Sequence, residues 1–273
     1  MSAEAEAERR GLVLGGGGVA GIAWELGLLT GLAERGVDLA RADVVVGTSA
    51  GSVVGATLLQ GGLAEAYRNQ AVPVEVENPG MGGFDLEELM AVLATAVQSS
   101  GSEQEARARI GAYAQSAPAA AIPEADRVAL IGSLLPSPEW PPGDLRVTAV
   151  DATDGSFTVY ESSSGVPLAV ALTASCAVPG VGPTMTINGR PFMDGGMRSG
   201  TNADVAQDCD RVLVVACLPE AAESRLGPSL TEAVAQLRES AEVLVVEADL
   251  DSRTAFGANP LLMSVRWALA SIV

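Results

Sequence analysis

The chain lacks two residue types on which many catalytic and binding sites depend. It has no histidine in 273 residues, and its 16 basic residues are all arginine. Without histidine, it cannot form a Ser-His-Asp or Cys-His nucleophile system or a histidine-ligated metal site. Without lysine, it cannot form a Schiff base, a Ser-Lys pair or a Walker-type phosphate loop. An activated nucleophile in this chain therefore needs a carboxylate as its base.

Cysteine and positive charge are also scarce. The cysteines, Cys176, Cys209 and Cys217, are odd in number and form no CxxC pair, which argues against a disulfide framework or a zinc site. We expect buried free thiols in a reducing, cytoplasmic environment. The net charge of −18 repels nucleic acid, whose binding depends on neutralising phosphates. It also disfavours adsorption to an anionic membrane, so we expect at most transient membrane contact.

No apolar run in the sequence is typical of a membrane-spanning helix. The span Gly11–Ala33 contains a single charge, Glu25, and is long enough to cross a bilayer, but its glycine cluster would make a poor helix. The run Leu261–Val273 is too short to span, and the acidic N-terminus leaves no room for a signal peptide. We therefore expect no transmembrane segment. Nothing in the sequence indicates the oligomeric state.

Alternating strand and helix patterns predict an α/β fold. With 48% hydrophobic and 4% aromatic residues, the core must consist mainly of alanine, valine and leucine. Gly11–Leu14 and Asp43–Val46 are apolar runs typical of buried strands, and a glycine-containing turn and a helical pattern follow each of them. Two such units indicate a sheet with parallel strands. Asp154-Gly155 and Asn188-Gly189 indicate hairpins. Further strands are expected at Leu145–Val150, Ser156–Tyr160, Thr184–Ile187, Pro191–Met193, Arg211–Ala216 and Glu242–Val246, and further helices at Val166–Ala174 and Ser229–Ser240.

Residues 79–142 interrupt this alternation. The stretch opens with PGMGG, continues with leucines at helical spacing, and becomes rich in proline and alanine. We predict a helical excursion over one end of the sheet, which is either a cap over a site or a plain connector. The chain, residues 1–273, is predicted to form a single domain with this insertion.

The motif GTSAG, residues 47–51, follows the second apolar run. A serine at a strand-to-helix elbow can be a nucleophile, because the strained turn exposes its hydroxyl. The helix that follows also favours negative charge near Ser49. Gly47 and Gly51 stand where the backbone segments approach most closely. An ordinary glycine-rich turn has the same pattern, so the motif alone leaves both interpretations open.

The cluster GGGGVAG also has two interpretations. Gly16, Gly18 and Gly21 match the GxGxxG fingerprint of dinucleotide-binding proteins. That fingerprint expects an acidic residue at the end of the second strand, where this chain has Val46. Glycine N–H groups at a helix N-terminus can instead form an oxyanion hole. The presence of GTSAG favours an oxyanion hole over a non-enzymatic nucleotide-binding module.

A carboxylate that could act as the base lies in the sequence MDGG. By itself, Asp194-Gly195 indicates an ordinary turn. In chain order, however, GGGGVAG, GTSAG, ASCAVPGVGP and PFMDGGMRSGTNADVA resemble the motifs of the patatin-like phospholipase family. Each motif is weak alone, but the ordered set is highly specific. The resemblance runs from about Gly11 to Val215.

This resemblance implies a Ser-Asp dyad in which Ser49 is the nucleophile and Asp194 the base. The implied oxyanion hole consists of backbone N–H groups of the loop residues Gly16, Gly17, Gly18 and Val19. The implied fold is a three-layer α/β/α sandwich around a mostly parallel sheet. The implied activity is hydrolysis of lipid acyl esters, of the phospholipase A type, through an acyl-enzyme and without a cofactor or metal.

Such a dyad places a demand on the aspartate. A free aspartate has a pKa of about 3.9 and is a weak base, whereas burial raises the pKa and makes the carboxylate more basic. We therefore expect Asp194 to be poorly solvated and hydrogen-bonded to Ser49.

Two positions depart from the family's pattern. The chain has Ala20 where the glycine loop usually carries Lys or Arg, and Gly182 where an aromatic residue is frequent. With the net charge of −18, the missing cation favours neutral esters over anionic phosphate head groups. A carboxylesterase or acyltransferase that acts on neutral esters is therefore the main alternative, because the same acyl-enzyme can pass its acyl group to an alcohol.

Overall fold

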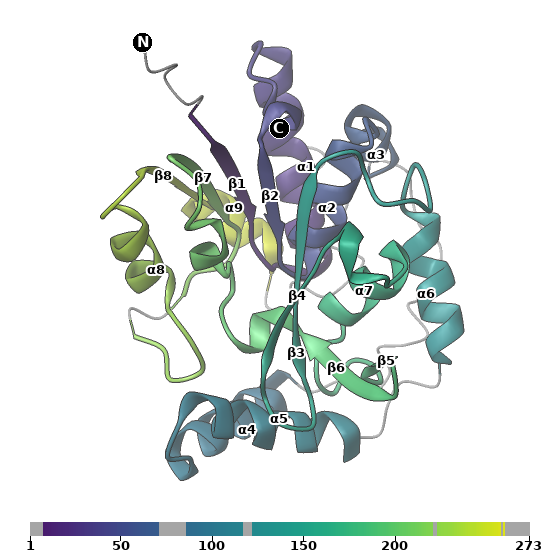
Figure 1. The fold of residues 1–273 in the computed structure, drawn as a ribbon, viewed down its shortest axis with the longest axis vertical. Coiled ribbons are helices and arrows are strands. Elements are labelled where there is room, and N and C mark those ends of the chain that lie inside the picture. The colour runs from purple at the N-terminus through teal and green to yellow at the C-terminus, as the bar shows by residue number, and fades with distance from the viewer. Residues whose placement is uncertain (1–7, 71–85, 117–121, 221–222, 258, 260–273) are drawn as a thin grey trace, which may run out of the picture.

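The structure is a computed structural model in which residues 8–70, 86–116, 122–220, 223–257 and 259 are described. Within these residues, eight strands form a mixed sheet in the order β5-β6-β3-β2-β1-β7-β8, and β4 also pairs with β3 (Figure 1). The strands β3, β2, β1, β7 and β8 are parallel neighbours, while β4, β5 and β6 pair in antiparallel fashion. The strands are β1 (Arg10–Leu14), β2 (Val44–Gly47), β3 (Asp144–Asp151), β4 (Phe157–Tyr160), β5 (Met185–Ile187), β6 (Arg190–Asp194), β7 (Arg211–Ala216) and β8 (Glu242–Glu247).

The helices connect these strands and cover them. They are α1 (Gly18–Glu34), α2 (Ala50–Leu59), α3 (Leu63–Gln70), α4 (Leu86–Ser99), α5 (Glu103–Ser116), α6 (Glu124–Ser133), α7 (Leu168–Ser175), α8 (Leu230–Leu237) and α9 (Leu250–Phe256), with the short 3₁₀ helices η1 (Leu39–Arg41), η2 (Ser162–Ser164), η3 (Gly195–Met197) and η4 (Ala203–Ala206).

Alternate residues of the buried strands supply two separate cores. The central strand β2 is a run of valines that are fully buried, as expected for a parallel strand covered on both faces. On one face, Val45 joins a core with Leu12 of β1 and residues of α1, α2 and α7. On the other face, Val46 joins Val13 and residues of η4 and α8. The sheet is therefore flanked by helices on both sides.

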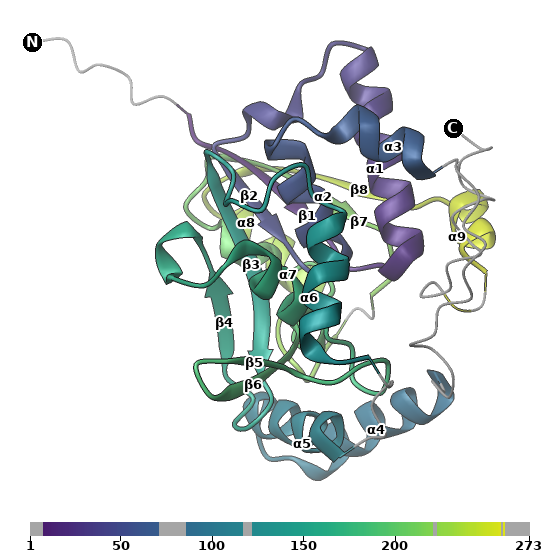
Figure 2. The same cartoon turned by 90° about the vertical axis from the view of Figure 1, so that its right-hand side faces the viewer.

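Helices α4 and α5 lie across one end of the sheet, as both views show (Figures 1 and 2). Ile110 and Ala114 of α5 pack against Val150 of β3 and Met193 of β6. Helix α6 packs against α7 instead. The described part of the predicted excursion, residues 86–116 and 122–142, is thus mainly helical, with α4 and α5 across the end of the sheet and α6 against α7.

The predicted α/β class, with a mostly parallel sheet flanked by helices, is confirmed. The predicted strands lie within one or two residues of the observed ones. The Asn188-Gly189 hairpin is confirmed, with φ values of 51° and 78° that suit these two residue types. Helices α3 and α9 were not predicted, and they are short, with eight and seven residues.

Within the described residues, no helix is both long enough and apolar enough to cross a membrane. The apolar span that includes α1 packs instead against the sheet.

Candidate active site

Ser49 lies on a sharp turn between β2 and α2. Its φ of 51° and ψ of −116° are strained for a residue with a side chain. Gly47 and Gly51 make the turn possible, because a Cβ atom on Gly51 would lie 2.1 Å from the Leu14 carbonyl oxygen and one on Gly47 would lie 2.4 Å from the Ser52 Cα. The elbow predicted for GTSAG is present, and its tightness explains both glycines.

Replacing Gly51 by alanine is expected to destabilise the fold strongly, because the new methyl group collides with backbone of β1 rather than with a movable side chain. We expect a loss of about 3 kcal/mol or more in the free energy of unfolding, measured by denaturant titration. Gly132→Ala is the matched control, since its Cβ would meet only Ala169 at 3.7 Å. Equal stability of the two variants would contradict the close approach.

The glycine loop before α1 faces Ser49 at the carboxyl ends of β1 and β2. Its first two amides are used structurally: Gly15 N–H donates to the Val215 carbonyl at 3.0 Å and Gly16 N–H to the Gly200 carbonyl at 2.7 Å. The N–H groups of Gly17, Gly18 and Val19 have no hydrogen-bond partner among the described residues. Gly16 is therefore an anchor of the loop and not a free donor.

Asp194 ends β6, where its N–H donates to the Ala177 carbonyl at 3.0 Å. The carboxylate is 2% exposed. Its Oδ1 accepts the Gly196 N–H at 2.7 Å, whereas its buried Oδ2 has no hydrogen-bond partner among the described residues. One carboxylate oxygen is thus fixed, and the other is left able to accept a proton.

Burial raises the pKa of Asp194 to about 6. The Ser49 hydroxyl, the Gly196 N–H and the Arg127 guanidinium each lower that pKa, but their combined effect is smaller than that of desolvation. The poor solvation that the sequence predicted is therefore confirmed. The predicted hydrogen bond between Ser49 and Asp194 is not formed in this structure, since Oδ2 has no partner among the described residues and Oδ1 accepts the Gly196 N–H. The expected result is a carboxylate that is ionised at neutral pH and yet more basic than a free aspartate.

One cavity of about 210 Å³ brings these groups together. Its lining includes Ser49, Asp194 and the loop glycines Gly16, Gly17 and Gly18, but not Val19. The other lining residues are Leu86, Leu89, Val178, Gly196, Met197, Gly200, Thr201, Ala216, Cys217, Leu218 and Glu220. Segments that are far apart in the sequence therefore contribute a hydroxyl, a carboxylate and free amides to the same small space.

Sequence reasoning missed the polar support beneath the elbow. Asn202 has a left-handed backbone, with φ of 49°, and its amide donates to Thr48 Oγ1 at 3.1 Å and to the Gly195 carbonyl at 3.2 Å. Thr48 Oγ1 also contacts Thr148 Oγ1 at 2.9 Å. These bonds tie the residue before Ser49 to the residue after Asp194. The quoted stretch GTNADVA contained Asn202 but did not reveal this contact.

The apolar wall contributed by α4 was also missed. Leu86 and Leu89 begin that helix and line the cavity. Their spacing indicated a helix, but helical spacing does not reveal which distant surface a helix covers. The predicted excursion therefore contributes two residues to the lining of the cavity, and its role as a cap stays a prediction.

Gly182 is one of the two positions where the sequence departs from the family pattern. The space that a side chain at this position would occupy is taken by Arg127. The Arg127 guanidinium of α6 packs on this glycine, so that a Cβ at Gly182 would lie 3.0 Å from the Arg127 Cζ atom. The missing side chain at residue 182 thus makes room for an arginine from the excursion.

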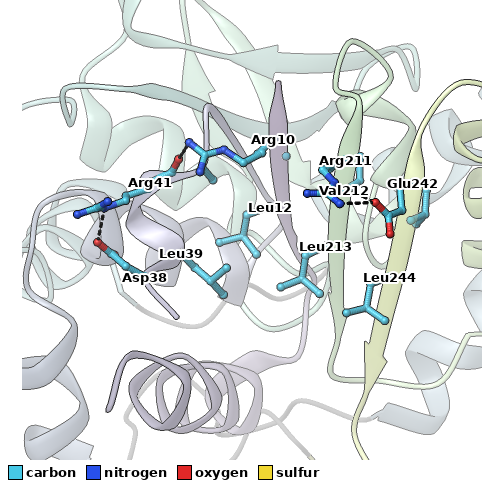
Figure 3. A pocket seen from close by; sticks show the side chains of 13 residues that line it. Arg10, Leu12, Asp38, Leu39, Arg41, Arg211, Val212, Leu213, Glu242 and Leu244 are labelled. Carbon is cyan, nitrogen blue, oxygen red and sulfur yellow. Dashed lines mark hydrogen bonds and ion pairs between the residues drawn. The ribbon is translucent and has the colours of Figure 1, made fainter. Parts of the chain in front are cut away.

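A second hollow, of about 400 Å³, lies at the opposite ends of the parallel strands (Figure 3). Leu12, Leu213 and Leu244 form its apolar floor. The arginines at its rim already have partners: Arg41 binds Asp38 and Arg211 binds Glu242. Although larger than the Ser49 cavity, this hollow contains no nucleophile and no unpaired base among the residues that line it. We therefore assign the candidate chemistry to the smaller cavity.

The sequence comparison identifies one family. A family model described as "Patatin-like phospholipase" matches residues 12–206, a stretch that includes Ser49 and Asp194. No curated protein sequence shows a significant match to the chain.

Solved structures match over much of the chain but at low identity. VipD from Legionella pneumophila is 15% identical, with a TM-score of 0.42, and the match covers 80% of this chain and 51% of that one. A structure of full-length ExoU in complex with SpcU, from Pseudomonas aeruginosa, gives 17% identity and a TM-score of 0.41, covering 97% and 52%. The chain thus corresponds to about half the length of these proteins.

Proposed function

This chain belongs to the patatin-like phospholipase family, and from that premise we propose that it is a serine hydrolase of acyl esters with Ser49 as nucleophile and Asp194 as base. The observation that carries the proposal is the shared cavity. It combines a serine on a strained elbow, a buried carboxylate with one free oxygen, and backbone amides without partners. In a chain without histidine, a carboxylate must act as the base, and Asp194 lines the same cavity as Ser49 and has its pKa lowered by the Ser49 hydroxyl.

The reaction begins with attack on the ester carbonyl. The Ser49 oxygen bonds to the carbonyl carbon while its proton moves to Asp194 Oδ2. The electron pair of the carbonyl moves onto its oxygen, where the free N–H groups of Gly17 and Gly18 stabilise the negative charge. The bond to the alcohol then breaks, and Asp194 returns the proton to the leaving oxygen.

Water completes the cycle. It attacks the acyl-enzyme and gives a proton to Asp194, which passes that proton to the departing Ser49 oxygen. The products are a free carboxylic acid and the restored serine. No further group is required, because each proton that Asp194 accepts is returned within the same half-reaction.

The lining of the cavity supports a neutral ester with an apolar acyl chain. Its charged residues are Asp194 and Glu220, and no arginine is among the described lining residues. An anionic phosphate would therefore meet negative charge without a cation to pair with. Leu86, Leu89 and Met197 provide apolar contact for the acyl chain.

Hydrolysis of matched lipids tests this proposal. Dioctanoylglycerol and dioctanoyl phosphatidate carry the same acyl chains and differ in the phosphate. We expect fatty acid release from both to depend on Ser49, with kcat/KM at least tenfold higher for the neutral lipid, a difference of about 1.4 kcal/mol.

The two parts of the proposal fail separately. Release of fatty acid no faster than by Ser49→Ala would contradict the hydrolase. A preference for the phosphatidate would be consistent with a hydrolase but would contradict the proposed preference for neutral esters.

A further inference from the structure

We propose that Arg127 is a positioning residue for Asp194: it fixes the loop that holds the aspartate backbone and keeps a positive charge beside the buried carboxylate. This inference rests on the proposed function, because it concerns the base of that reaction. Arg127 does not line the cavity, so its role is to act through Asp194 rather than on the substrate.

Arg127 is held by contacts with residues of a loop on the neighbouring part of the fold. It lies on α6, in the excursion, and its side chain is half-buried. The guanidinium packs on Gly182 and donates to the Pro183 carbonyl. A side chain at residue 182 would collide with it, so the two positions fit each other.

The loop that Arg127 contacts also holds the backbone of Asp194. Residues 177–183 connect α7 to β5 and turn back on themselves, with Val181 N–H donating to the Val178 carbonyl at 3.1 Å. At the start of this loop, the Ala177 carbonyl accepts the Asp194 N–H at 3.0 Å, and Val178 lines the cavity. Arg127 holds the end of the same loop. The arginine and the aspartate are therefore joined through one short loop.

The positive charge of Arg127 has no ion-pair partner among the described residues, unlike the charges of two comparable arginines. Arg146 and Arg198, which are similarly sheltered, form ion pairs with Asp208 and Asp204. Arg127 has no carboxylate within ion-pair distance among the described residues. A guanidinium stays protonated at any physiological pH. Arg127 therefore carries a positive charge that no directly contacting carboxylate neutralises.

The charged and titratable groups around Asp194 come from several elements. Three groups raise the pKa of the Arg127 guanidinium, in decreasing order of effect: Cys176 at the end of α7, Glu124 of its own helix, and Asp194. Burial raises the pKa of the Cys176 thiol to about 12, so the thiol is neutral. The Gly196 N–H donates to Asp194 Oδ1 at 2.7 Å, and the Ser49 hydroxyl lowers the pKa of the carboxyl. Among these groups, Arg127 is the one that carries a positive charge, and it lowers the pKa of Asp194 against the larger effect of burial.

The experiment removes the charge and keeps the donor. Arg127→Gln retains an N–H group for the Pro183 carbonyl but is neutral. In a pH profile of kcat/KM for para-nitrophenyl butyrate, we expect the midpoint of the acidic limb to rise by about half a pH unit to one unit. The rate should fall about twofold to fivefold near pH 6 and recover by about pH 9.

Two further variants complete the design. Arg127→Lys should restore the wild-type midpoint, because it restores the charge. Arg109→Met, which removes an exposed arginine paired with Glu105 on α5, should leave the profile unchanged. If Arg127→Gln does not fold, Arg127→Met provides a second neutral variant, and the lysine variant still tests whether charge alone suffices.

The outcomes distinguish this inference from the proposed function. An equal loss at every pH, with an unchanged midpoint, would show a purely structural arginine and overturn the electrostatic role. Full activity of Arg127→Gln at all pH values would overturn both roles. Absence of Ser49-dependent turnover in the wild type would instead refute the hydrolase itself.

Discussion

Ser49→Ala is expected to lower esterase activity by about 10⁴-fold or more, because removal of a nucleophile leaves only binding and oxyanion stabilisation. A fluorophosphonate should form one covalent adduct with the wild-type protein and none with this variant, as measured by intact-protein mass spectrometry. The physical reason is the elbow, which directs the Ser49 side chain into the cavity with Asp194.

A matched serine serves as the control. Ser133 lies on α6, and its hydroxyl donates to the Leu130 carbonyl, so Ser133→Ala should label and hydrolyse as the wild type does. Covalent labelling of Ser49→Ala would mean that another residue is the nucleophile. Ser49→Gly adds a separate test of the strain at φ 51°. We expect this variant to be inactive, with a free energy of unfolding higher than that of Ser49→Ala by about 1 kcal/mol or more.

Asp194→Asn should have the second largest effect. Asparagine can still accept the Gly196 N–H, but it cannot take the Ser49 proton, so we expect kcat to fall about 10³-fold or more. In the wild type, kcat/KM should rise with pH through about 6, because the base must be ionised and its pKa is raised to that value. The variant should lose this acidic limb.

Asp194→Asn should raise the free energy of unfolding, although it lowers activity. The pKa of Asp194 is about 6 in the folded chain against an ordinary 3.8, so the native carboxyl binds its proton more tightly than the unfolded one does. The ionised, buried carboxylate therefore destabilises the fold. This destabilisation is absent below pH 3.8 and complete above about pH 6. At about pH 8, Asp194→Asn should therefore be about 2–3 kcal/mol more stable than the wild type.

Asp126 offers a control for both measurements. It is an exposed aspartate on α6, so Asp126→Asn should change neither the pH profile nor the stability appreciably. Retention of more than a tenth of the wild-type rate by Asp194→Asn would exclude this aspartate as the base.

The sequence was most informative where chemistry depends on local conformation. Ser49 and its glycines follow a strand and precede a helix, so their geometry is fixed by neighbours in the chain. The strands of the sheet were located within one or two residues, because runs such as Val44–Val46 have few alternatives to a buried strand.

Contacts between distant segments could not be predicted in this way. Asn202 supports Thr48 across 154 positions, and Arg127 contacts Pro183 across 56. Neither residue belongs to a periodic pattern, and a polar residue in a loop is compatible with many partners. The role of Gly16 illustrates the same limit. Its N–H is committed to the Gly200 carbonyl, and only tertiary structure distinguishes an anchoring amide from a free one.

The stretch matched by the family ends at residue 206, whereas the sheet does not. Residues 211–215 of strand β7 pair with all of β1, and the Val215 carbonyl accepts the N–H of Gly15 in the glycine loop before α1. A polypeptide truncated after Ala206 would retain Ser49 and Asp194 but would expose an unpaired edge of β1, which invites aggregation. The smallest piece able to fold on its own must therefore extend past the stretch matched by the family, and expression trials of shortened versions should keep β7 and β8.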